Sequence, residues 1–214
     1  ALTEARIYLN PGHGSWGPDD RPAATIPYPN LASTGRPDTC GFYESNTNLW
    51  KVLHLGAVLE QMGVKPANIM FSRVKNGPYP YAGKVAGYQE FNRPLSEISG
   101  EVEANNMDMF LSVHSNGAPD DFTNFTLFLY RGKDGEGGDS VPTSRAMAKT
   151  VWPFMLTNEI DPTTSYSSTN VNIRGDMDFY GDYDTVVNVY SHKAYTGYLG
   201  VLKHGVPGFL SEGY

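Results

Sequence analysis

The chain of 214 residues carries a formal net charge of −7, with 40% hydrophobic residues and a single cysteine, Cys40. A chain of this length can bury a sizeable core as one domain. The acidic balance, without any cluster of Lys and Arg, argues against binding to nucleic acid or to an anionic membrane surface. No apolar run reaches the roughly 18 residues of a transmembrane helix, and a lone cysteine cannot form an intrachain disulfide.

Short apolar runs alternate with amphipathic segments along the chain. Strands are expected at 7–9, 69–71, 110–113, 125–130 and 206–212. Helices are expected at 44–62, 95–107, 140–156 and 198–204, the first with Gly63 as its C-cap. Pro153 should kink or end the third of these helices. The alternation predicts an α/β fold in a single domain, with a mainly parallel twisted sheet and helices on both faces.

Two of the expected strands run into a histidine followed by turn residues. His13 follows the strand at 7–9 within Asn-Pro-Gly-His-Gly, and His114 follows the strand at 110–113 within His-Ser-Asn-Gly. Ligand sites of open α/β sheets lie at the carboxyl ends of the strands, so we expect both imidazoles there. His54, inside a helix, is assigned no role, and His204 is expected at the surface.

Two carboxylates occupy comparable positions in the sequence. Glu44 opens the first helix, where an acidic side chain also interacts favourably with the helix dipole, and Glu212 ends the last strand. Two imidazoles and one carboxylate form the ligand set of catalytic zinc sites, which keep a fourth position for a water of lowered pKa. A carboxylate that does not bind the metal can accept the proton of that water. Because these residues are dispersed along the chain, no spacing motif marks them, and on the residues alone the site is only a hypothesis.

Five segments follow one another in a specific order that covers nearly the whole chain. They are Leu-Asn-Pro-Gly-His-Gly at 9–14, Glu44 with a helix closing on Met-Gly-Val at 62–64, Phe-Ser-Arg at 71–73, Glu-Ala-Asn-Asn at 103–106 with Phe-Leu-Ser-Val-His-Ser-Asn-Gly at 110–117, and Val-Pro-Gly-Phe-Leu-Ser-Glu-Gly-Tyr at 206–214. In this order the sequence resembles the zinc-dependent N-acetylmuramoyl-L-alanine amidases of the Amidase_3 type.

The resemblance implies a function and a role for each site residue. His13, Glu44 and His114 would bind one Zn²⁺ per chain, and Glu212 would be the catalytic carboxylate. The implied reaction is hydrolysis of the amide between N-acetylmuramic acid and L-alanine in peptidoglycan, carried out in the periplasm, in the cell envelope or after secretion. Residues 1–214 would form the catalytic domain, with or without flanking segments, and the sequence does not indicate whether an activator protein takes part.

The sequence departs from the family pattern at several points. Asn10 stands where the family has Asp, Ser15 stands where it has Gly, and the family's Arg before Ala104-Asn105 is absent. The separation of His13 from Glu44 is longer than expected, and the family continues past the catalytic Glu into a further helix. The acidic, tyrosine-rich loops at 15–43 and 157–192 are expected to flank one cleft.

Three alternatives remain open from the sequence. His13-Gly-Ser15-Trp-Gly17 nearly matches the G-x-S-x-G motif of serine hydrolases, but a histidine replaces the first glycine. The tyrosine-rich loops would also suit a non-catalytic glycan-binding module. A zinc peptidase that cuts within the stem peptide is the third alternative.

Overall fold

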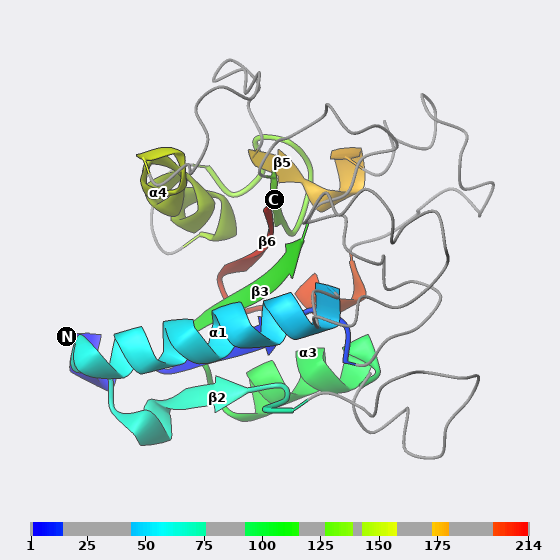
Figure 1. Cartoon of the computed structure of the whole chain (residues 1–214). Coiled ribbons are helices and arrows are strands. Elements are labelled where there is room, and N and C mark those ends of the chain that lie inside the picture. Colours follow the sequence, from blue (N-terminus) through cyan, green and yellow to red (C-terminus); the bar gives the residue numbers. More distant parts are fainter. Residues whose placement is uncertain are drawn as a thin grey trace, which may run out of the picture.

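The structure is a computed structural model that describes residues 2–14, 44–75, 93–115, 127–138, 143–157, 173–179 and 199–213 (Figure 1). For Glu44 and Glu212 it describes the backbone only. Ser15, Cys40, the loop at 15–43 and most of the segment 157–192 lie outside this range, and with them the expected cleft between the two loops.

The described elements alternate as the sequence predicts. In chain order they are η1 (Leu2–Glu4), β1 (Ile7–Pro11), α1 (Glu44–Gln61), η3 (Pro66–Asn68), β2 (Ile69–Phe71), α3 (Leu95–Ala104), β3 (Met109–Ser115), β4 (Leu127–Tyr130), α4 (Ser144–Thr157), β5 (Ile173–Gly175), η4 (Gly200–Leu202) and β6 (Gly208–Gly213). Among the described helices, none combines the length and the apolar character needed to cross a membrane.

The described strands form one six-stranded sheet in the order β2-β1-β3-β6-β4-β5. The pairs β1–β2, β1–β3, β3–β6 and β4–β5 are parallel, whereas β4 pairs with β6 in the antiparallel sense. The prediction of a mainly parallel sheet is confirmed. The carboxyl ends of β1, β2, β3 and β6 therefore meet at one edge, which is the edge that positions the site.

Side chains alternate across each strand, so neighbouring residues of β1 pack against different helices. Ile7 and Leu9 pack with Val52 of α1, whereas Tyr8 packs with Val102 of α3. On β6, Phe209 packs with Ala148 of α4. Leu111 of β3 packs against the apolar cluster that contains Val52 of α1 and also against the one that contains Ala148 of α4. These two helices therefore cover the same face of the sheet, and α3 covers the other face (Figure 1).

The end of α1 shows how local sequence sets an element boundary. Gly63 adopts φ +99°, a left-handed conformation that glycine reaches without steric cost. Its N–H donates to the carbonyl of Glu60 at 2.9 Å, and the N–H of Val64 donates to the carbonyl of Leu59 at 3.0 Å. This is the Schellman pattern, and the predicted C-cap is confirmed.

Three helices differ from their predicted ranges. In the described part of the segment predicted at 198–204, only the short 3-10 turn η4 (Gly200–Leu202) forms. The helix α3 ends at Ala104, and Asn106 then takes a positive φ of 48°. The helix α4 contains Pro153 and continues to Thr157, so the proline does not end it. Pro153 has no backbone N–H to donate within the helix. The helix nevertheless continues, and its packing on β4 and β6 supports it.

Glu101 of α3 is paired with groups from two other segments of the chain. Its carboxylate accepts a hydrogen bond from the Tyr8 hydroxyl at 2.5 Å and pairs with Arg93 at 2.6 Å. The hydrogen bond from Arg93 lowers the pKa of Glu101, and burial raises the pKa of Tyr8. The hydrogen bond between Tyr8 and Glu101 thus connects the middle of β1 to α3.

Candidate metal centre at the carboxyl edge

His13 and His114 lie side by side where β1 and β3 end. Pro11 pairs with Val113, and the N–H of Gly12 donates to the carbonyl of Val113 at 2.8 Å, so the turn after β1 is held against the end of β3. The two imidazole centroids are 5.1 Å apart, with an angle of 69° between the ring planes. Both rings are only partly buried.

Gly12 provides the space that the His114 ring occupies. A Cβ atom added at Gly12 would overlap the imidazole of His114. Any other residue at this position would therefore force the His114 ring or the turn itself to shift. Glycine is required at position 12 because the His114 side chain lies directly against its backbone.

The two carboxylate positions lie at the same edge of the sheet. Glu212 of β6 pairs in register with His114 of β3, and neighbouring strands are about 4.8 Å apart. Glu44 is the first residue of α1, and the carbonyl of the next residue, Ser45, is joined to the His13 turn through Arg73. The backbone thus brings all four predicted positions to one edge.

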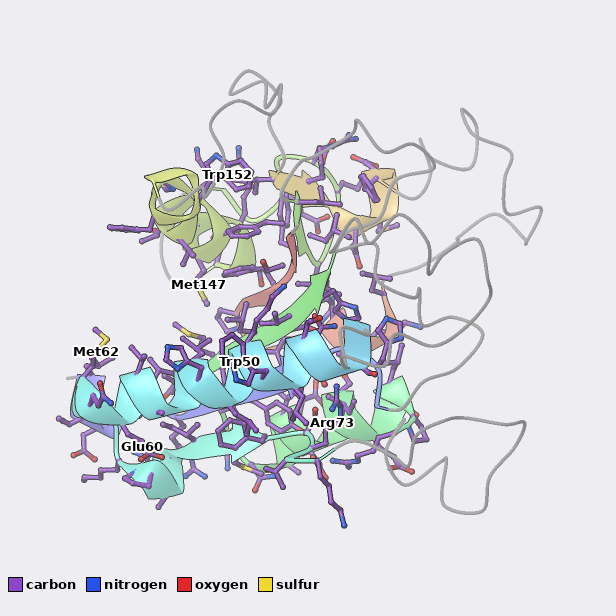
Figure 2. The ribbon with its side chains drawn as sticks, viewed as in Figure 1. Trp50, Glu60, Met62, Arg73, Met147 and Trp152 are labelled. Carbon is purple, nitrogen blue, oxygen red and sulfur yellow. The ribbon has the colours of Figure 1, made fainter. Side chains whose placement is uncertain are left out.

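Arg73, just after β2, makes the contacts that hold this edge together (Figure 2). Its side chain donates from Nε to the carbonyl of His13 at 2.8 Å and from Nη2 to the carbonyls of Gly12 and Ser45 at 2.7 and 3.1 Å. His13 has a positive φ of 59°, which costs a non-glycine residue about 1–2 kcal/mol. Hydrogen bonds from a charged group contribute about 1.5–3 kcal/mol each. The two bonds from Arg73 to the carbonyls of Gly12 and His13 therefore outweigh the energy of this strain.

A buried polar triad lies in the strands that lead to the site. Asn10 donates from Nδ2 to the Ser112 hydroxyl at 2.8 Å and accepts from the Ser72 hydroxyl at 2.6 Å. All three residues are buried. Their hydrogen bonds satisfy the amide and fix the carboxyl ends of β1, β2 and β3 relative to one another.

The residues present fit a zinc ion in their chemistry and in the spacing of the two rings. Two imidazoles that bind one tetrahedral zinc place their ring centres about 5 Å apart, which agrees with the pair His13 and His114. Among the described side chains, no group of three or more His, Cys, Asp and Glu could hold a metal ion. Of the residues predicted for the site, Glu44 and Glu212 are the remaining candidates for a third ligand, and their carboxylates are not among those side chains.

Sequence reasoning placed His204 at the surface, and the structure contradicts this. His204 is 3% exposed, and its ring lies 4.5 Å from the ring of Phe110. Its Nδ1 lies 3.0 Å from the carbonyl of Val206, to which it can only donate, and burial lowers its pKa to about 4. The signal that could have indicated burial is the apolar sequence on both sides, Val201-Leu202 and Val206.

Arg73 was not among the site residues predicted from the sequence. The available signal was its position, because it follows a short strand just as His13 and His114 do. The triad partners Ser72 and Ser112 carried no signal of their own, since serine at the end of a strand is common in turns.

The topology defines an α/β protein, and its polar cluster lies at the carboxyl ends of parallel strands, where open α/β sheets usually bind ligands. Solved structures with this fold include amidases. The N-acetylmuramoyl-L-alanine amidase AmiC2 of Nostoc punctiforme is 19% identical, with a TM-score of 0.52 over 96% of this chain and 77% of that chain. The catalytic domain of the amidase CwlV from Bacillus (Paenibacillus) polymyxa is 17% identical, with a TM-score of 0.53 over 96% and 78%. The amidase Ami1 from Mycobacterium smegmatis is 18% identical, with a TM-score of 0.56 over 99% and 82%.

The likeness to these structures concerns the fold. No family model matches the sequence, and no curated protein matches it either.

Proposed function

We propose that this chain is a zinc-dependent N-acetylmuramoyl-L-alanine amidase, which hydrolyses the amide between N-acetylmuramic acid and L-alanine in peptidoglycan. The observation that carries the proposal is the pair His13 and His114, whose ring centroids are 5.1 Å apart, with Glu212 in register beside His114. The fold shared with three amidases supports the same reaction class. The substrate would place the protein outside the cytoplasm.

The residues of the edge have separate roles in this proposal. His13, Glu44 and His114 would hold one zinc ion. Bound there, zinc would polarise the scissile carbonyl and lower the pKa of a water molecule, so that the water can attack near neutral pH. Glu212 would accept the proton of the attacking water and transfer it to the nitrogen of L-alanine as the carbon–nitrogen bond breaks.

The products of a digestion test the reaction directly. Muramyl peptides would be incubated with the purified protein, and the fragments would be identified by mass spectrometry. We expect N-acetylmuramic acid with its lactyl carboxylate free, together with a stem peptide that has L-alanine at its amino terminus. A chelator should stop the release, and added zinc should restore it.

Each rival function gives a different result. A new amino terminus inside the stem peptide would identify a peptidase. Binding of fragments without turnover, by metal-free protein, would identify a glycan-binding module. Turnover that survives the chelator but is lost to a serine-directed inhibitor would identify Ser15 as a nucleophile.

A further inference from the structure

Arg73 fixes the backbone on both sides of His13. The carbonyl of Gly12 belongs to the peptide plane before His13, and the carbonyl of His13 belongs to the plane after it. Nη2 and Nε of Arg73 hold these two carbonyls at 2.7 and 2.8 Å. Because peptide units are planar, fixing both planes fixes φ and ψ of His13 and therefore the direction of its Cα–Cβ bond.

The same guanidinium also holds the start of α1. Nη2 donates to the carbonyl of Ser45 at 3.1 Å, one residue after Glu44. Arg73 lies just beyond β2 and is only 8% exposed. It therefore contacts the turn after β1 and the start of α1 from inside the fold. In Figure 2 it lies beside the N-terminal half of α1.

We propose that Arg73 is a positioning residue, which sets the geometry of His13 and Glu44 relative to each other through three backbone carbonyls. Its link to zinc rests on the function proposed above. Outer partners that orient metal ligands typically change metal affinity by roughly 10–100-fold when they are removed. Arg73 differs from the usual outer partner because it holds the backbone of the ligand segments.

Lysine could not replace Arg73 in this role. A guanidinium offers several N–H donors in a rigid plane, and here one side chain serves three carbonyls in two segments. A lysine ammonium is a single point charge on a flexible stem and would lose the fixed geometry. Arg73→Lys therefore keeps the charge and removes the alignment.

Arg93 offers a matched control. It also bonds beside the end of β2, donating to the carbonyl of Ser72 at 3.0 Å, but its other partners among the described residues are the carboxylates of Glu97 and Glu101. Arg93→Ala removes a guanidinium from the same neighbourhood, one that is less buried than that of Arg73. It reports the cost of losing such a group without the proposed positioning.

The experiment measures zinc affinity by competition with a chromophoric chelator in the wild type, R73A, R73K and R93A. Hydrogen exchange of residues 7–14 is followed by mass spectrometry in the metal-free proteins. We expect R73A to bind zinc roughly 10–100-fold more weakly and R73K to be weakened as well, with R93A near the wild type. Exchange at 7–14 should be faster in R73A than in R93A.

Wild-type zinc affinity in folded R73A would overturn the proposal. If R73A does not fold, R73K decides, and wild-type affinity in folded R73K would overturn it equally. A wild-type protein that binds no zinc would refute the proposed function instead. In that case the exchange data stand alone: faster exchange in R73A supports the positioning role, and equal exchange in R73A and R93A rejects it.

Discussion

The turn His13-Gly14 follows β1, and the turn His204-Gly205 precedes β6, so the two histidines lie at opposite ends of the parallel strands. Strand β3 contacts both. Its His114, at the carboxyl end, lies edge-on to the His13 ring with the centroids 5.1 Å apart. Its Phe110, at the amino end, packs against the His204 ring with the centroids 4.5 Å apart. The first pair is partly exposed, and the second pair is buried.

The same dipeptide therefore serves two different purposes. At the amino end, His204 is a buried core residue. Its Nε2 has no hydrogen-bond partner among the described atoms, and burial lowers its pKa to about 4. At the carboxyl end, Arg73 and Gly12 hold His13 and His114 at the edge. The end of the sheet at which each histidine lies therefore distinguishes the candidate ligand His13 from the packed ring of His204.

The largest expected effect comes from His114→Ala. If the carboxyl edge binds zinc, this variant loses one of three protein ligands, the minimum of such sites. Zinc content measured by elemental analysis should fall sharply, and turnover of muramyl peptides should fall with it.

His204→Asn is the matched variant at the other end and should keep its zinc. Full zinc occupancy in His114→Ala would remove His114 from the proposed site. Loss of zinc in His204→Asn would show that the two ends are not independent.

The second expected effect is that of Glu212→Gln. Glutamine keeps the shape and the hydrogen-bonding capacity of the side chain but cannot accept a proton. Turnover should fall by roughly 10²–10⁴-fold, while zinc content stays near that of the wild type. A ligand would change both quantities, so the pair of measurements separates the base from a ligand. Wild-type turnover in this variant would require another carboxylate.

The smallest expected effect concerns pH and His204. Burial lowers its pKa in the folded state to about 4, below the unfolded value of about 6.5. As the pH falls, the unfolded chain binds a proton at His204 first, so stability is lost between about pH 6.5 and about pH 4. The difference amounts to about 3 kcal/mol of the free energy of unfolding.

His204→Asn keeps a donor for the Val206 carbonyl but does not titrate. Denaturant unfolding of both proteins at several pH values should show a smaller loss in the variant over this window. Parallel profiles for the two proteins would mean that His204 is not buried as a neutral ring.

The sequence predicted those features that depend on neighbouring residues. The strands β1, β3 and β6 are apolar runs ended by turn residues, and Gly63 ends α1 because of its own backbone freedom. The positions of His13 and His114 at one edge followed from a parallel sheet, since carboxyl ends of parallel strands meet. The direction of β4 did not follow, because periodicity says nothing about strand direction.

Features that depend on distant contacts were missed or mistaken. His204 is buried because β3 brings Phe110 against it, and Glu101 is paired because Arg93 and Tyr8 reach it from other segments. The contacts of Arg73 join carbonyls from two segments far apart in the chain. The roles of Glu44 and Glu212 rest on the resemblance and stay predictions.

The position of β6 has a consequence for folding. It is the last described strand along the chain, yet it lies in the middle of the sheet, between β3 and β4. Contacts of such large sequence separation form late, because the loop between them must close first. Until β6 inserts, the two parts of the sheet have open edges and Glu212 is absent from the end of β3. A nascent chain would thus gain its proposed catalytic carboxylate in the same step that inserts β6 into the sheet, and a partly folded chain would lack that carboxylate at the end of β3.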